Sequence, residues 1–314
     1  MGEKILVTGA FGLVGSDLVP ALQRKHGKEN VIALFHSRGC EHPEWTLEKG
    51  DVTDKSGLDK LIKKHGITQV YHLAGLISAG SEKNPQLAWE LNLGGLKNIL
   101  DLSVEHKLKV FWPSSIAAFG PTTPKQSTPQ HTILEPTTMY GVNKVAGELL
   151  CQYYFLRYGL DVRSLRYPGL IGWKADPGDG TTEYAISIFY GAIREGKYTC
   201  FLKEDSVLPM MYMEDAIKGT TDLMDAKNER VKVRTSYNFA SMSFAPKDIY
   251  LELKKLVPGL TIAYGPDFRQ KIADSWPKII DDSEARKDWG WKPKYDLPAM
   301  TKDMFEHLSE KLKK

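Results

Sequence analysis

Short apolar runs alternate with amphipathic stretches through the first half of the chain. The runs are β-branched or aromatic and of strand length, and they cover residues 4–8, 30–35, 69–73, 109–113 and 161–167, with a further candidate at 45–49. Helical patterns lie between them at residues 13–25, 56–65, 86–106 and 139–158. Strands that alternate with helices of this length form βαβ units, so the pattern predicts a doubly wound α/β domain with a parallel sheet covered on both faces.

The pattern changes after Pro168. Glycine and proline cluster over residues 168–180, and helical segments near 184–195, 214–226 and 246–257 follow, with strand-like pieces near 234–239 and 260–264. We expect residues 1–168 to form the doubly wound domain, with some later segments returning to it, and residues 169–314 to form mainly a smaller α/β lobe. Substrates of such sheets bind outside the carboxyl ends of the strands, so this lobe is the expected substrate-binding part, with the loop at 121–136 as a candidate flap.

Composition and charge exclude several classes of protein. The net charge of +3 comes from 42 basic and 39 acidic residues scattered along the chain, which gives little support to nucleic-acid binding. No run of about 18 uncharged apolar residues and no secretory signal occurs, so no membrane contact is expected. Cys40, Cys151 and Cys200 lie far apart and no HExxH motif is present, so we expect reduced thiols, a cytoplasmic protein and no metal site.

A glycine loop directly follows the first predicted strand. Gly9, Gly12 and Gly15 precede a helix, and glycines in this context allow the tight turn, the approach of a pyrophosphate and close packing of helix on strand. The sequence therefore predicts a Rossmann-type dinucleotide-binding domain, in which Phe11 and Leu13 of the loop also contact the cofactor.

Two further strand ends carry predicted cofactor contacts. Asp51 and Val52 follow the candidate strand at 45–49, and Leu73, Ala74 and Gly75 end the strand predicted at 69–73. Adenine and ribose contacts are expected at these places in this fold. Asp51 could alternatively cap a helix or turn.

The end of the second strand departs from the simple NAD pattern. A carboxylate that binds the ribose hydroxyls is expected about 20 residues after the glycines. His36, Ser37 and Arg38 stand there instead. The planar guanidinium of Arg38 can pair with a 2′-phosphate, or it can be a solvated loop charge. Both NAD and NADP therefore stay open as the cofactor.

A tyrosine and a lysine lie one helical turn apart in the segment 139–158. Tyr140 and Lys144 share a helix face, and a nearby ammonium favours the phenolate form of a tyrosine whose reference pKa is about 10. Ser115 closes the fifth predicted strand, where its hydroxyl can bind the reacting oxygen of a substrate, with Ser114 behind it. Ser115, Tyr140 and Lys144 are the predicted catalytic residues.

These motifs resemble the extended short-chain dehydrogenase/reductase superfamily, which includes nucleotide-sugar epimerases. The resemblance rests on the glycine loop, Ser115, Tyr140, Lys144, the HLAG motif at 72–75 and Asn92 in NLGGLKNIL. In the second half, RYPGLI from Arg166, GDGTTEYA from Gly178, LPMMYM from Leu208, SWP from Ser275 and DWGW from Asp288 are similar to the short-chain type of L-threonine 3-dehydrogenase.

The resemblance implies a reaction and a set of contacts. The reaction is oxidation of the L-threonine side-chain hydroxyl to give 2-amino-3-ketobutyrate, with NAD as cofactor in a homodimer. Cofactor contacts then include Asn92, Tyr140, Lys144 and Tyr167. The amino-acid substrate lies among Ser115, Tyr140 and the following residues: Ser78, Gly180, Thr181, Thr182 and Trp276. From the residues alone, Thr181 and Thr182 could instead cap a helix, and Trp276 could belong to the core.

Two rival functions and one assembly hypothesis accompany this prediction. A nucleotide-sugar 4-epimerase would use the same three catalytic residues, and a non-catalytic dinucleotide-binding protein would keep only the glycine loop. The helical segments 86–106 and 139–158 carry apolar residues on more than one face, which predicts a four-helix contact between two subunits.

Overall fold

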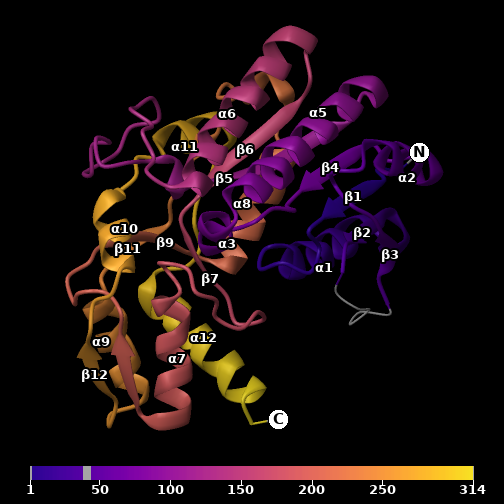
Figure 1. The fold of residues 1–314 in the computed structure, drawn as a ribbon. Coiled ribbons are helices and arrows are strands. Elements are labelled where there is room, and N and C mark those ends of the chain that lie inside the picture. Colours follow the sequence, from indigo (N-terminus) through magenta and orange to yellow (C-terminus); the bar gives the residue numbers. More distant parts are fainter. Residues whose placement is uncertain (1, 38–43, 314) are drawn as a thin grey trace. The chain divides into compact units, whose positions relative to one another are not determined.

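A computed structural model describes residues 2–37 and 44–313, and it divides the chain into two compact units (Figure 1). Unit 1 comprises Met1–Ala118, Thr137–Arg166 and Thr220–Tyr237, and unit 2 comprises Phe119–Pro136, Tyr167–Gly219 and Asn238–Lys314. The chain therefore passes between the units several times. Within the described residues, no helix has the length and apolar character needed to cross a bilayer.

Unit 1 is built on a seven-stranded sheet in the order β10-β6-β5-β4-β1-β2-β3. The strands are β1 (Ile5–Thr8), β2 (Val31–Phe35), β3 (Thr46–Lys49), β4 (Gln69–His72), β5 (Lys109–Ser115), β6 (Val162–Tyr167) and β10 (Tyr237–Asn238). β1 pairs in parallel with both β2 and β4, and β2–β3 and β4–β5 are parallel too. The structure confirms the predicted α/β, Rossmann-type doubly wound sheet. The strand order reverses beside β1, and ligands of such sheets bind at that point.

The helices of unit 1 follow the predicted pattern closely. They are α1 (Gly15–His26), α2 (Lys55–His65), α3 (Ser78–Lys83), α4 (Pro85–Trp89), a π-helical turn η2 (Glu90–Gly94), α5 (Gly95–His106) and α6 (Met139–Tyr158). Three short 3₁₀ turns lie at Lys28–Asn30, Ile116–Ala118 and Asn228–Arg230, and α8 (Met213–Asp225) runs across the boundary between the units along the chain. The predicted helix at 86–106 is interrupted by the π turn, where the side chain of Asn92 binds backbone groups of Leu76.

Helix α6 has the bounds that the sequence predicts. It begins where the Thr138 hydroxyl accepts a hydrogen bond from the Gly141 N–H at 3.1 Å, and it ends at Gly159, whose φ of 68° is left-handed. Gly147 lets α6 lie directly on β5, because a Cβ there would come within 2.3 Å of Cη2 of the buried Trp112 ring. Close contact between α6 and the end of β5 thus depends on a residue without a side chain.

Unit 2 contains two small sheets and five helices among its described residues. The sheets are β11 (Met242–Phe244), β9 (Leu208–Tyr212) and β7 (Gly169–Ile171), and β12 (Thr261–Tyr264) with β8 (Lys197–Cys200). The helices are α7 (Tyr184–Glu195), α9 (Pro246–Leu256), α10 (Arg269–Ser275), α11 (Ser283–Trp289) and α12 (Leu297–Lys311). The sequence did not indicate β7, β8, β9, β11, α3 or α10 to α12, because short buried strands such as β9 lack alternation and short helices lack a clear period.

The proline-rich loop at 121–136 is anchored within unit 2. Backbone hydrogen bonds join Thr128 to Ile279 and Asp281 at 2.9 and 3.0 Å, and the Lys278 N–H donates to the Lys125 carbonyl at 2.9 Å. These bonds hold the loop against residues 278–281, so its described conformation is not that of a free flap.

Gly147→Ala is expected to destabilise the protein by about 1–3 kcal/mol, the usual cost of overpacking a core, because the new methyl group displaces the Trp112 ring. This cost exceeds the roughly 1 kcal/mol that alanine contributes over glycine inside a helix. The urea midpoint of unfolding measures it. Gly94→Ala is the matched control, since nothing lies within 4 Å of the Cβ position at Gly94. Equal midpoints for the two variants would contradict the packing role of Gly147.

Candidate active site

The end of β5 and the first turns of α6 bring the three predicted catalytic residues together within unit 1. The Ser115 hydroxyl acts on the Tyr140 phenol and lowers its pKa. The Lys144 ammonium donates to the Pro113 carbonyl at 2.6 Å, and its Nζ lies 5.2 Å from the centre of the Tyr140 ring and 4.6 Å from that of Trp112. The structure thus places a phenol between a serine hydroxyl and an ammonium group.

Burial acts against the charged form of both titratable groups. It raises the pKa of Tyr140 to about 12, although the Ser115 hydroxyl lowers that pKa. It lowers the pKa of Lys144 to about 8, although the Glu148 carboxylate raises that pKa. The sequence suggested that Lys144 lowers the pKa of Tyr140. In the structure the lowering comes from Ser115, and the stronger effect of burial favours the protonated phenol at neutral pH.

A buried ion pair lies behind these residues. The Ser114 hydroxyl donates to Oε1 of Glu148 at 2.6 Å, and Arg166 of β6 donates to the same carboxylate at 2.9 and 2.7 Å. The Glu148 and Arg166 side chains are 1% and 3% exposed. Reasoning from the sequence missed Glu148, although its position one helical turn after Lys144 was a usable signal.

The glycine loop has the close backbone approach that a dinucleotide requires. Gly9 has a left-handed φ of 67°, and a Cβ there would lie 2.7 Å from the Ala74 nitrogen. At Gly15 a Cβ would lie 2.5 Å from the Gly9 carbonyl oxygen, where α1 begins. The N-cap residue of α1 is Val14, whose side chain makes no capping bond, and Asp17 lies in the first turn of this helix. The backbone N–H groups and the positive end of the helix dipole point toward the loop. Phe11 of the loop stacks on Trp45, with ring centres 5.5 Å apart, and Leu13 is half-buried.

A carboxylate comes near the end of β2 from a different strand. Asp51, which follows β3, accepts hydrogen bonds from the Thr53 N–H and hydroxyl at 2.8 Å each, which lower its pKa. Its Oδ2 lies 3.6 Å from Nε2 of His36. Ser37 is exposed, and Arg38 lies outside the described residues. Asp51 therefore forms the turn that the sequence allowed as an alternative, and its carboxylate also stands beside His36.

The segment after β4 is held by buried polar groups. Nδ1 of His72 and the Thr8 hydroxyl are 2.8 Å apart, and burial lowers the pKa of His72 to about 3, so this ring is neutral. Asn92 binds both backbone groups of Leu76, at 2.7 and 3.1 Å, and donates to Asn143 of α6 at 3.1 Å. Asn92, expected to touch the cofactor, thus connects this segment to the helix that carries Tyr140.

The structure also describes four other residues that were predicted to contact the cofactor, three of them in unit 1 and one in unit 2. Val52 is buried, and Leu73 donates its N–H to the Thr8 carbonyl at 3.2 Å. A Cβ at Gly75 would lie 2.8 Å from the Asn92 side-chain oxygen. Tyr167 belongs to unit 2, where its ring lies 5.9 Å from that of Phe239.

The predicted substrate residues are divided between the two units. Ser78 begins α3 in unit 1, and Gly180, Thr181, Thr182 and Trp276 belong to unit 2. Neither threonine caps α7, because the cap residue is Glu183 and no side chain bonds there. A Cβ at Gly169 would lie 2.7 Å from the Thr182 methyl group, so the threonine segment packs on β7.

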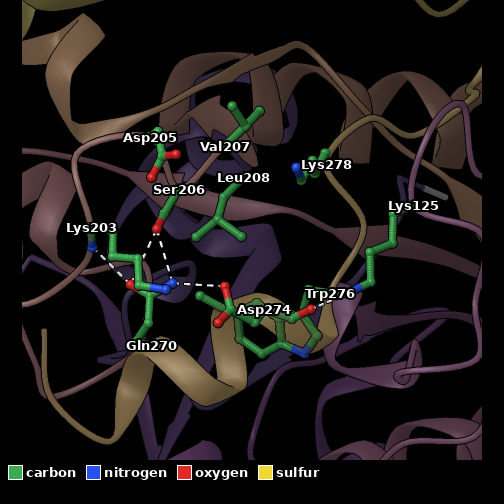
Figure 2. Close-up of a pocket in the computed structure, with 11 residues that line it drawn as sticks. Lys125, Lys203, Asp205, Ser206, Val207, Leu208, Gln270, Asp274, Trp276 and Lys278 are labelled. Atoms are coloured by element: carbon green, nitrogen blue, oxygen red, sulfur yellow. Dashed lines mark hydrogen bonds between the residues drawn. The ribbon is translucent and has the colours of Figure 1, made fainter.

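Trp276 forms part of the wall of a cavity of about 320 Å³ within unit 2 (Figure 2). Leu208 and Ala273 add apolar surface, while Gln270 is held by Ser206 and Asp274. The lining is completed by charged side chains, namely Lys125, Lys203, Lys278 and Asp205. Gly180, Thr181 and Thr182 are not in the lining of this cavity.

Comparison with known proteins identifies the family. The model of the NAD dependent epimerase/dehydratase family matches residues 5–240. An uncharacterized epimerase/dehydratase of Staphylococcus haemolyticus is 46% identical over 317 residues, which cover 98% of this chain and 98% of that protein.

Two solved structures are similar over nearly the whole chain. A GalE-like L-threonine dehydrogenase from Cupriavidus necator in its holo form is 52% identical, with a TM-score of 0.95 over 97% of this chain and 99% of that chain. The apo form of a monomeric L-threonine 3-dehydrogenase from a metagenome is 45% identical, with a TM-score of 0.94 over 98% of this chain and 99% of that chain.

These matches agree with the family resemblance predicted from the motifs. The glycine cradle and the placement of Ser115, Tyr140 and Lys144 suit an enzyme that uses a nicotinamide dinucleotide. The protein is an NAD(P)-dependent oxidoreductase, and this chain belongs to the NAD dependent epimerase/dehydratase family.

Proposed function

We propose that this protein is a short-chain L-threonine 3-dehydrogenase that oxidises the side-chain hydroxyl of L-threonine to 2-amino-3-ketobutyrate. The observation that carries the chemistry is the grouping of Tyr140 with Ser115, whose hydroxyl lowers the pKa of the phenol, and with Lys144, whose ammonium lies 5.2 Å from the centre of the Tyr140 ring. Similarity to threonine dehydrogenases over nearly the whole chain supports the choice of substrate.

The chain's own residues perform the proton transfer. Ser115 holds the substrate hydroxyl, and Tyr140 as phenolate takes its proton. A bound oxidised nicotinamide would supply the acceptor for the hydride that leaves the same carbon. Lys144 would hold the ribose, and its charge favours the phenolate of Tyr140. Because burial raises the pKa of Tyr140 to about 12, forming this base requires nearby positive charge.

Recognition of the amino acid needs partners for a carboxylate and an ammonium group. Hydroxyls and backbone N–H groups bind a carboxylate without a basic side chain. We assign this binding to the hydroxyls of Ser78, Thr181 and Thr182 and to the Gly180 N–H, and we assign the cover over the amino acid to Trp276.

A nucleotide-sugar 4-epimerase is the second candidate, and one observation favours it. The cavity beside Trp276 is lined by Lys125, Lys203 and Lys278, and ammonium groups bind phosphates. Asp205 and Asp274 line the same cavity and offset much of that charge. Oxidation of L-threonine is therefore better supported than epimerisation of a nucleotide sugar.

The cofactor assigned to this reaction is NAD. A 2′-phosphate near His36 would meet the carboxylate of Asp51, whose pKa is lowered by its bonds to Thr53. Arg38 could oppose this effect by pairing with the phosphate. The free cysteines Cys151 and Cys200 are buried, which is compatible with a cytoplasmic enzyme.

We also propose a homodimer. Helix α6 exposes Leu149, Tyr153 and Leu156 at 57%, 52% and 73%, and Leu87 and Trp89 of α4 are 49% and 51% exposed. Both helices belong to unit 1, and a four-helix contact with a second copy would cover these side chains. One similar dehydrogenase is described as monomeric, so the assembly needs a direct measurement.

Purified protein with L-threonine and NAD is expected to produce reduced nicotinamide, measured at its absorption near 340 nm, and kcat/KM with NADP is expected to be lower. Arg38→Ala should lower the rate with NADP further if Arg38 binds the 2′-phosphate. UDP-galactose without added cofactor is the control. Sugar epimerisation together with no threonine oxidation by either cofactor would overturn the assignment.

Tyr140→Phe is expected to lower kcat by roughly 10²–10⁴-fold, the usual contribution of a general base. The ring is kept, so the melting temperature should not change. Tyr153→Phe is the matched control, because Tyr153 lies on the same helix with a side chain that is 52% exposed. Parent activity should rise with pH as Tyr140 loses its proton, and kcat/KM should fall again at alkaline pH where Lys144 loses its own proton. A Tyr140→Phe enzyme as fast as the parent would remove this mechanism.

Leu156→Glu is expected to shift the protein from dimer to monomer, because a carboxylate would be desolvated in the contact. Light scattering at micromolar concentration gives the mass of both proteins. Lys60→Glu, on the exposed surface of α2, is the control for added charge. A monomeric parent protein would refute the dimer.

A further inference from the structure

Three consecutive residues of β5 act on three successive turns of α6. The Ser115 hydroxyl lowers the pKa of Tyr140, the Pro113 carbonyl accepts from Lys144 at 2.6 Å, and the Ser114 hydroxyl donates to Glu148 at 2.6 Å. The first two contacts belong to the active site described above. The third holds a carboxylate one helical turn from the Lys144 position, with no role in the proposed reaction.

The Glu148 carboxylate is held rigidly. Nε and Nη2 of Arg166 donate to its two oxygens at 2.9 and 2.7 Å, so the ion pair is bidentate. Both side chains are almost completely buried, so solvent screens this charge little. A buried ion pair of this kind is often no more stable than a well-packed apolar pair, so stability alone is a weak explanation for it.

We infer that Glu148 is a positioning residue, whose buried carboxylate, fixed by Arg166 and Ser114, keeps Lys144 protonated beside Tyr140. This inference rests on the proposed use of Tyr140 and Lys144 in catalysis. In this role Glu148 acts on Lys144, and Lys144 in turn favours the phenolate of Tyr140. Glu148 itself does not contact the substrate.

The other groups near Lys144 contribute less than Glu148. The Cys151 thiol on α6 also raises the pKa of Lys144 but ranks after Glu148, and burial raises the pKa of this thiol, which favours its neutral form. His72 on β4 has a pKa of about 3 and is neutral. Burial favours the protonated form of Tyr140, and Pro113 of β5 offers only its carbonyl dipole. Among the described residues, Glu148 is the leading charge that raises the pKa of Lys144.

The sign of the effect follows from these charges. Burial alone favours neutral Lys144, and the carboxylate opposes burial, with a resulting pKa of about 8. Replacing the carboxylate by an amide removes the opposing charge, so the pKa of Lys144 falls toward neutral pH. Arg166 then adds a positive charge without its partner, which lowers that pKa further. Above the new pKa, Tyr140 loses its cationic neighbour.

Competitive acetylation with acetic anhydride measures the pKa of Lys144 without substrate or cofactor. The half-buried Lys144 and the exposed Lys60, as internal reference, are followed by mass spectrometry between about pH 6 and 10. In Glu148→Gln we expect the Lys144 midpoint to fall by about 1–3 pH units, the usual effect of a close opposite charge. Glu148→Asp keeps the carboxylate, and its midpoint should stay near that of the parent.

The same variants test whether the labelling midpoint of Lys144 and the pH dependence of kcat/KM change together. In Glu148→Gln the loss of kcat/KM at alkaline pH should move to lower pH in parallel with the labelling midpoint. Ser114→Ala removes a hydrogen bond but keeps the carboxylate, so its midpoint should stay within the error of the parent value. A failure of threonine oxidation in the parent would sink the proposed function, whereas the labelling result would still stand.

A second variant serves as the control if Glu148→Gln does not fold. Glu148→Gln leaves Arg166 buried without its ion-pair partner, and circular dichroism reports whether the variant folds. If it does not, Glu148→Gln with Arg166→Met removes both charges, and the Lys144 midpoint should still fall, by a smaller amount. A midpoint equal to that of the parent, in whichever of these variants folds, would overturn the positioning role of Glu148.

Discussion

The docking of helix α6 on the end of strand β5 is the contact on which the active site depends. Trp112 packs on Gly147, and of the following three residues of the strand Pro113 binds Lys144, Ser114 binds Glu148, and Ser115 lowers the pKa of Tyr140. Hydrogen bonds to charged groups, such as those of Lys144 and Glu148, contribute about 1.5–3 kcal/mol net each, and together they fix both the height and the rotation of the helix. A serine, a tyrosine and a lysine are thereby held in one geometry.

The protonation state of Tyr140 depends on the charges that lie beside it. Burial favours protonated Tyr140 and brings Lys144 close to losing its proton. In the proposed mechanism a positively charged nicotinamide would favour the phenolate, and the Glu148 carboxylate would favour the ammonium. The same low polarity that makes each charge costly also makes its neighbours effective over short distances. The proposed phenolate therefore depends on positive charge close to the ring.

The cofactor loop and the catalytic helix are connected by buried polar groups rather than by apolar packing alone. Thr8 of β1 binds His72 and the Ala74 N–H, and Asn92 joins the backbone at Leu76 to Asn143 of α6. The π turn at Glu90–Gly94 contains Asn92. Such turns occur often at functional sites, because they shift one side chain out of helical register. Here Asn92 links the segment after β4, where cofactor contacts are predicted, to α6, which carries Tyr140.

What the sequence determined by itself was the local part of this design. The 3.6-residue period, Thr138 and Gly159 set the bounds of α6, and the βαβ alternation with the glycine loop established the fold and the catalytic candidates. Only the tertiary structure decided the partnership of Glu148 with Arg166 and Ser114, the approach of Asp51 to His36, and the pKa values of Tyr140 and Lys144. The reason is physical: periodicity and capping act between near neighbours, whereas burial and charge depend on strands and helices that the chain brings together from distant positions.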